Sequence, residues 1–169
     1  ADVRLELYVR AKTMEAIDAT HERVDAALRA GGDAVGAQTI IETLPGMFPL
    51  SCNKRMNELM VENSLLADPD VEIKDAGHFS ASTDMGDVSH LMPVIHPFIG
   101  GNVGLLHAPD FHMVDFNAAV LLPAKAFAMM LVDLLYDDAQ EAKSILADFK
   151  PILTKEEYIA KLESYFSAK

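Results

Sequence analysis

The spacing of hydrophobic and polar residues predicts a strand, a helix and a second strand near the start of the chain. Residues 3–9 alternate apolar and polar side chains, which is the two-residue period of a half-buried strand. Thr13 then precedes apolar residues at helical spacing, so it is placed to cap a helix that Gly31-Gly32 would end. Residues 36–44 predict the second strand. Because two strands alone are rarely stable, this unit requires at least one further strand.

The pattern becomes helical in the next segment. Ser51 is placed to cap a helix over residues 52–66, in which apolar side chains gather on one side. Two short apolar segments follow, at 71–73 and 91–99, and each has the composition of a strand. Two prolines interrupt the second segment. Since proline is poorly tolerated inside a sheet, we expect this segment to be irregular or to lie at a sheet edge.

The longest apolar segment, 114–135, predicts a helix over roughly 116–135 with one face in a core. Pro123 should bend this helix or mark the start of its regular part. Charged residues interrupt the segment, so a buried helix is a better interpretation than a membrane span. These residues are Asp115, Lys125 and Asp133. Two short amphipathic helices follow, and the second opens with Thr154 and Glu157 in the spacing of a capping box.

Composition and charge narrow the class of protein. The chain has 169 residues, of which 50% are hydrophobic, enough for a sizeable core. Its net charge of −12 argues against a nucleic-acid partner, because affinity for a phosphate backbone depends on Lys and Arg. The single cysteine, Cys52, excludes an internal disulfide and fits a reducing compartment. No apolar stretch with a basic flank opens the sequence, so no secretory signal is visible and we expect a cytoplasmic protein.

The residues that could carry chemistry are concentrated in two predicted loops between glycines and prolines. The first contains Ser82-Thr83-Asp84-Met85-Gly86-Asp87-Val88-Ser89-His90, which combines hydroxyl groups, carboxylates and an imidazole. The second contains Leu106-His107-Ala108-Pro109, shortly before the long helix. Side chains in loops can converge on a ligand instead of on a core, so these two segments are the candidates for function.

These segments resemble the C-terminal part of the M20 family of metallopeptidases and amidohydrolases. The resemblance is carried by the Ser-Thr-Asp-Met-Gly-Asp-Val-Ser segment, by the turn Gly100-Gly101-Asn102 and by a histidine before a closing helix. Within the family it is closest to the branch of aminobenzoyl-glutamate hydrolases and aminoacylase-like dipeptidases. The family's N-terminal metal-binding segments have no counterpart here, since the sequence contains no His-x-His-x-Asp run.

The resemblance implies an α/β fold in two parts. Residues 1–48 would be the second half of a small βαβ lid, the domain through which family members commonly dimerise. Residues 49–169 would be the C-terminal part of a zinc-peptidase-like α/β catalytic domain. We therefore expect a truncated chain, a proteolytic fragment or one piece of a split protein, and a homodimer formed through the lid.

His107 is the metal ligand that the resemblance implies. A neutral imidazole suits Zn²⁺ or Mn²⁺. A metal site needs about three or four protein ligands. We therefore expect His107 to bind one metal ion, in a site of one or two ions, and the other ligands to be absent from this chain. The alternative is a loop histidine hydrogen-bonded to backbone. Several histidines lie close together in sequence, but no spacing forces them into one site. They are His78, His90, His96, His107 and His112.

The first segment is the substrate-binding loop that the resemblance implies. There it would lie beside the metal centre, where Ser82, Thr83 and Asp84 could hydrogen-bond a substrate amide or carboxylate. Asp87 and His90 would continue the same loop. The alternative is structural, because Ser, Thr, Asp and Gly also form turns by bonding their own backbone.

The implied activity is metal-dependent hydrolysis of an amide bond in an N-acyl amino acid, an aminobenzoyl-glutamate or a dipeptide. The partner would be this small-molecule substrate, with neither nucleic acid nor membrane involved. The general base would lie in the absent N-terminal part, so no catalytic residue is assigned here and we expect the isolated chain to be inactive. The alternative is a non-catalytic dimerisation or binding module, or a separate subunit.

Overall fold

The computed structural model describes residues 2–75, 77 and 81–168, and the chain divides into two compact units. The first unit consists of Ala1–Ser51, Ala76–Met92 and Pro151–Lys169, and the second of Cys52–Asp75 and Pro93–Lys150. The first division, after Ser51, is close to the domain boundary expected at residue 48. The segment that contains the candidate substrate loop groups with the N-terminal unit.

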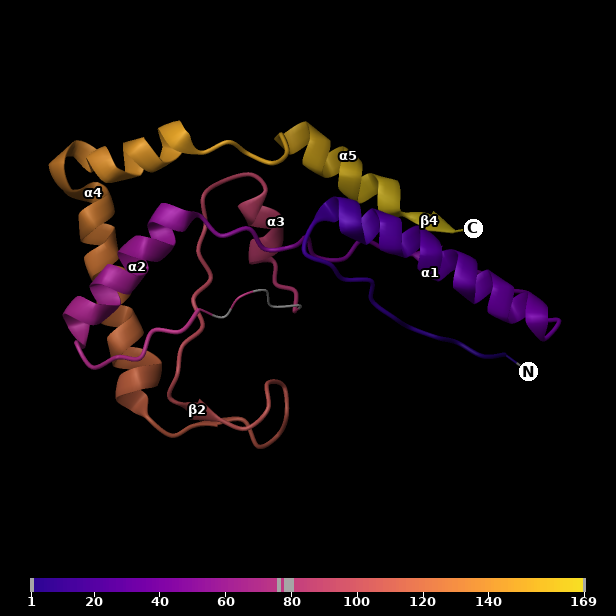
Figure 1. The fold of residues 1–169 in the computed structure, drawn as a ribbon, viewed down its shortest axis with the longest axis horizontal. Helices are drawn as coiled ribbons and strands as arrows, with labels where there is room; N and C mark the ends of the chain where they lie inside the picture. The colour runs from indigo at the N-terminus through magenta and orange to yellow at the C-terminus, as the bar shows by residue number, and fades with distance from the viewer. Residues whose placement is uncertain (1, 76, 78–80, 169) are drawn as a thin grey trace. The chain divides into compact units, whose positions relative to one another are not determined.

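The first unit contains two longer helices (Figure 1). The helix α1, Met14–Ala34, begins as predicted at Thr13, whose hydroxyl accepts a backbone hydrogen bond of the first turn. The helix α5, Lys155–Tyr165, begins with the predicted capping box, in which Thr154 and Glu157 each accept a hydrogen bond from the other's backbone. Both starts were predictable because a cap depends only on residues within one helical turn.

Asp18 of α1 joins this helix to α5. Its carboxylate accepts hydrogen bonds from Lys161 Nζ and from the Tyr165 hydroxyl, each at 2.6 Å. Partial burial raises the pKa of Asp18, but the two hydrogen bonds outweigh burial and hold this pKa below its ordinary value of 3.8. The same contact raises the pKa of Lys161. The pair therefore stabilises the α1–α5 packing while both groups are charged.

The strands predicted for this unit are largely not formed. Residues 3–9 belong to no strand, and in the segment 36–44 only β1, Glu42–Thr43, is a strand. It pairs antiparallel with β4, Ser167–Ala168. A half-buried strand needs a sheet to cover its apolar side, and within the described residues this pair has no third strand. Val3 is accordingly 80% exposed.

Two helix ends differ from the prediction. The helix α1 runs through Gly31-Gly32, and Gly36, with a φ of 71°, follows its actual end. The helix α2, Lys54–Ala67, is capped by Asn53 and not by Ser51. The backbone N–H of Ser51 instead donates a hydrogen bond to Ser89 Oγ, a contact between segments far apart in sequence.

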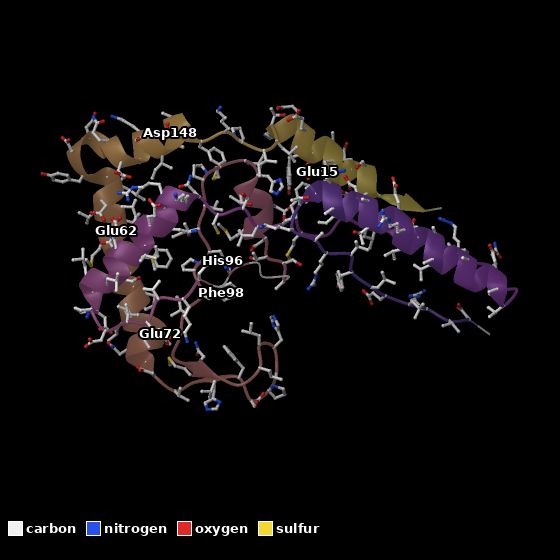
Figure 2. All side chains as sticks on the ribbon, viewed as in Figure 1. Glu15, Glu62, Glu72, His96, Phe98 and Asp148 are labelled. Carbon is white, nitrogen blue, oxygen red and sulfur yellow. The ribbon has the colours of Figure 1, made fainter. Side chains whose placement is uncertain are left out.

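The second unit is built on α2 and on α4, Leu122–Asp148, which lie against each other (Figure 1). The buried side chains of their contact are Leu59, Met60, Ala126, Met130 and Ile145. A single π-helical turn, η1, Asn117–Leu121, precedes α4. Pro123 stands in the first turn of α4, so of the two alternatives, a bend or the start of the regular helix, the second is found. In the segment 93–101, which forms no strand, the rings of His96 and Phe98 meet edge to face at 5.6 Å (Figure 2).

The long helix is interrupted after Leu135, where its end was predicted. Residues 136–139 leave helical geometry, and Asp137, Asp138 and Ala139 have left-handed φ values of 48–58°. Helix η1 and α4 together are long and apolar enough to cross a membrane by length and composition alone. Only 17% of their most apolar stretch is buried, so the expected core helix is covered on one side only.

Substituting Asp18→Asn should weaken the α1–α5 contact by about 0.5–1 kcal/mol at pH 7, because both charged side chains are partly exposed and screened by solvent. The pKa of Asp18 is lowered in the fold, so its contribution is present above the ordinary value of 3.8 and is lost as the pH falls below it. Urea unfolding at several pH values measures the difference. Glu22→Gln, an equal charge change at an exposed position of α1, is the control, and equal effects of both variants at pH 7 would contradict the contact.

Candidate functional site

The candidate substrate loop leads into a short helix, α3, Met85–Ser89, in the first unit. The carboxylate of Asp84 accepts hydrogen bonds from the Met85 backbone N–H at 3.0 Å and from the Thr83 hydroxyl at 3.1 Å. Gly86 lets the helix approach the preceding part of the chain, since a Cβ at this position would overlap the carbonyl oxygen of Phe48. A glycine is therefore required at position 86 for this close approach.

Asp87 links α3 to two other segments of the unit. Its carboxylate accepts a hydrogen bond from the Phe48 backbone N–H at 3.3 Å and another from the Tyr158 hydroxyl at 3.1 Å. The rings of Phe48 and Tyr158 also meet edge to face at 5.4 Å. Burial, and then the hydrogen bond to Asp87, raise the pKa of Tyr158. This phenol therefore stays protonated as a donor to Asp87.

Ser89 and His90 complete the attachment to residues 48–51. The buried hydroxyl of Ser89 accepts a hydrogen bond from the Ser51 backbone N–H at 3.0 Å. His90 is 3% exposed, its Nε2 lies 3.0 Å from the Pro49 carbonyl oxygen, and its ring contacts Phe48 edge to face. A carbonyl oxygen only accepts, so Nε2 carries the proton. Among the described residues the buried Nδ1 atom has no hydrogen-bond partner.

The loop thus has an anchored half and an open half. Asp87 and His90 contact neighbouring segments, whereas Ser82 and Asp84 are exposed and Thr83 is half-buried. The open half has hydroxyl and carboxylate groups at the surface that could contact a ligand. The anchored half of the loop positions the open half. Gly86 and Ser89, which sequence reasoning did not single out, carry much of this attachment, and the only signal in the sequence was their place within the motif. Binding of substrate by the five predicted residues remains a prediction.

His107 lies in the second unit, on the loop of a hairpin formed by β2, Asn102–Val103, and β3, His112–Met113. It is exposed, and its backbone is left-handed with a φ of 65°, which is uncommon for a residue with a side chain. Gly101 has a φ of 85°, and a Cβ there would lie 2.6 Å from the Asp115 carbonyl oxygen. The backbone therefore bends at Gly101 and requires a glycine there, whereas Asn102 of the predicted turn belongs to β2.

The metal site that the resemblance implies is not complete within the part of the chain that the structure describes. No group of three or more His, Cys, Asp or Glu side chains there could hold a metal ion. His78 lies outside the described residues. His107 would thus need ligands from outside the described residues, and no catalytic step follows from the described residues alone.

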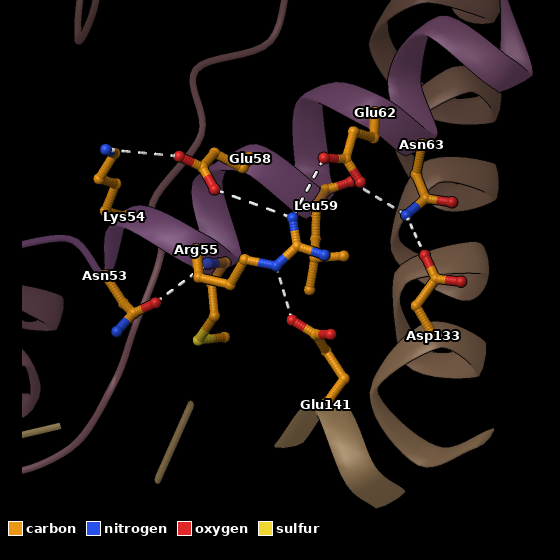
Figure 3. Close-up of polar contacts among 10 residues, drawn as sticks. Asn53, Lys54, Arg55, Glu58, Leu59, Glu62, Asn63, Asp133 and Glu141 are labelled. Carbon is orange, nitrogen blue, oxygen red and sulfur yellow. Dashed lines mark hydrogen bonds and ion pairs between the residues drawn. The ribbon is translucent and has the colours of Figure 1, made fainter. Parts of the chain in front are cut away.

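A surface hollow of about 360 Å³ lies between α2 and α4 in the second unit. In this hollow the Arg55 guanidinium donates hydrogen bonds to Glu141 at 2.6 Å and to Glu62 at 3.1 Å. The Asn63 amide donates one to Asp133 at 2.6 Å (Figure 3). The hydrogen bond to Glu141 is the main cause of a raised pKa of Arg55. Because these polar groups bond one another, we assign the hollow a structural role in holding α2 against α4.

The chain is similar in sequence to a known hydrolase. It is 28% identical over 163 residues to the Xaa-Arg dipeptidase of Mus musculus, and the match covers 92% of this chain and 38% of that protein. The chain thus spans less than two fifths of the relative's length. No protein-family model matches the chain, and no solved structure matches it. This distant similarity supports a hydrolase of the peptidase class.

Substituting Gly86→Ala should destabilise the chain by roughly 1–3 kcal/mol, because the added methyl group must displace the Phe48 carbonyl from α3. Urea unfolding measures the loss. Gly46→Ala is the matched control, since a Cβ there meets no atom within 4 Å. An unchanged free energy of unfolding in the Gly86 variant would show that α3 does not pack against residues 48–51 as described.

Proposed function

We propose that this chain is the C-terminal part of a metal-dependent amidohydrolase of the M20 family that cleaves a dipeptide or an N-acyl amino acid. The extent of the dipeptidase similarity carries the proposal. A match over 92% of the chain spans its middle, where both candidate loops lie. The resemblance of the 82–90 segment and of His107 to that family supports the same assignment from particular residues.

The open half of the substrate loop binds the substrate in this proposal. The hydroxyl of Ser82 donates a hydrogen bond to a substrate carboxylate or carbonyl, and the Thr83 hydroxyl oxygen and the Asp84 carboxylate accept hydrogen bonds from substrate N–H groups. Gly86 and Asp87 hold the loop on residues 48–51 before the substrate arrives. A preformed loop loses little conformational entropy on binding, which favours affinity for a small ligand.

His107 provides one ligand to a divalent metal ion, Zn²⁺ or Mn²⁺, in this proposal. Its exposed position on the hairpin loop leaves the imidazole accessible to an ion held by a second segment. The other ligands and the general base come from the larger part of the relative's length that this sequence does not span. The isolated chain is therefore inactive, because a hydrolytic site needs about three protein ligands.

The test uses the longer polypeptide encoded by the reading frame that contains this sequence. We expect it to hydrolyse dipeptides, with Xaa-Arg substrates as the first panel. Substituting His107→Gln should lower kcat/KM by about 100-fold or more and reduce the bound metal, because a ligand is lost. His112→Gln on the same hairpin is the control and should keep both the metal content and most of the activity.

A different experimental result would contradict each part of the proposal. Normal metal content in the His107→Gln variant would exclude this histidine as a ligand. Hydrolysis of dipeptides by the purified 169-residue chain with added Zn²⁺ or Mn²⁺ would contradict the assignment of the remaining site to another part of the protein. A native 169-residue homodimer without hydrolytic activity would favour the dimerisation module.

A further inference from the structure

We infer that the uncovered side of α4 is the surface on which the remaining part of a longer polypeptide packs, through an apolar face of its own. This inference rests on the proposed function and adds the place of contact. Ala126 and Met130 on one side of α4 are buried in the contact with α2. The opposite side carries a second row of apolar residues, which we call the exposed stripe. It consists of Leu121, the last residue of η1, and of Ala124, Ala128, Leu131 and Leu135 of α4.

The exposed stripe has the spacing of a packing surface. Its members are three and four residues apart, so they lie on one face of the helix. Leu131 is 56% exposed and Leu135 is 65% exposed, and Val132 beside them is 63% exposed. A helix that is apolar on all sides is normally buried in a larger core or in a membrane. The stripe therefore needs a cover that the described residues do not provide.

The exposed area of the whole chain indicates how much surface a larger partner would cover, on the stripe and elsewhere. The chain leaves 12207 Å² accessible to solvent. Two separate globular domains, each with half of the chain's 18.4 kDa, would together expose about 9,900 Å². The chain thus exposes about 2,300 Å² more than its two units would if each were compact, whatever their arrangement. A standard interface covers only about 800 Å² on each partner, so a second copy docked through the stripe alone would leave most of this excess exposed.

The chemistry of the helix favours protein over lipid as the cover. Lys125 and Asp133 both lie within the apolar stretch, and a span of about 20 residues would place them in the hydrocarbon layer. Regular helical geometry also ends at Leu135, because residues 136–139 have non-helical φ and ψ values, so α4 does not continue as one straight span. More than three fifths of the dipeptidase relative lies beyond the match, enough chain to supply an apolar face.

Cysteine labelling of the longer polypeptide tests the inference. In a Cys52→Ser background, Leu131→Cys and Leu135→Cys report on the stripe, and Ser144→Cys reports on an exposed polar position of the same helix. In the longer polypeptide we expect maleimide to react with both stripe cysteines roughly tenfold more slowly than in the 169-residue chain, because the thiols are buried. The Ser144→Cys rate should be the same in both.

The outcomes separate this inference from the proposed function. If the reading frame encodes no longer polypeptide and the chain is isolated without a larger companion, the proposed function fails. If a longer polypeptide hydrolyses dipeptides while the stripe cysteines react at the rate seen in the 169-residue chain, only this inference fails. Protection of the 169-residue chain by phosphatidylcholine–phosphatidylglycerol vesicles would assign the stripe to lipid and overturn it. Protection that rises with chain concentration, together with a dimer mass, would assign the stripe to a second copy and also overturn it.

Discussion

The close approach of α3 to the Phe48 carbonyl is the contact on which the candidate substrate loop depends. Glycine at position 86 permits this approach, and the side chains that follow it then bond the same short segment. Asp87 accepts the Phe48 N–H, Ser89 accepts the Ser51 N–H, and His90 lies against Pro49. Buried polar groups bonded in this way hold a loop in one conformation. The second half of the motif therefore attaches the loop to residues 48–51, and the first half lies at the surface.

A second constraint links the fold to the functional proposal. The chain has a small buried core and a long apolar helix that is covered on one side. Its candidate metal site is also incomplete, because the described residues do not supply His107 with the further ligands that a metal ion needs. Both features have one explanation if the chain is part of a longer dipeptidase-like hydrolase. The other part would then supply the remaining ligands, the general base and a cover for the exposed stripe.

Some local signals in the sequence predicted the structure, although Gly31-Gly32 does not end α1 and Ser51 does not cap α2. The signals that depend on distant partners did not predict it. The caps at Thr13 and Thr154 follow from residues within a turn of each other, and the long helix is interrupted after Leu135, where its end was predicted. The strand predicted at 3–9 is not formed, because a strand requires a partner that alternation alone does not provide.

The candidate site shows the same division. Sequence pattern and resemblance singled out the 82–90 loop and His107, but not the task that each residue of the loop performs. The sequence did not predict that Gly86 and Ser89 attach the loop to the fold. Their partners lie about 38 residues earlier in the chain. Ser51 was predicted as a helix cap and instead serves this contact, while Asn53 caps α2.

The most direct test of the account is the intact mass of the polypeptide that carries this sequence in its source cells. An antiserum raised against residues 1–169 would isolate it for mass spectrometry. The account predicts a polypeptide about 2.4 times the 18.4 kDa of this chain, because 92% of the chain matches 38% of the dipeptidase relative. It also allows an 18.4 kDa chain held in a stable complex with a second, larger polypeptide. An 18.4 kDa polypeptide isolated without a companion would contradict the account.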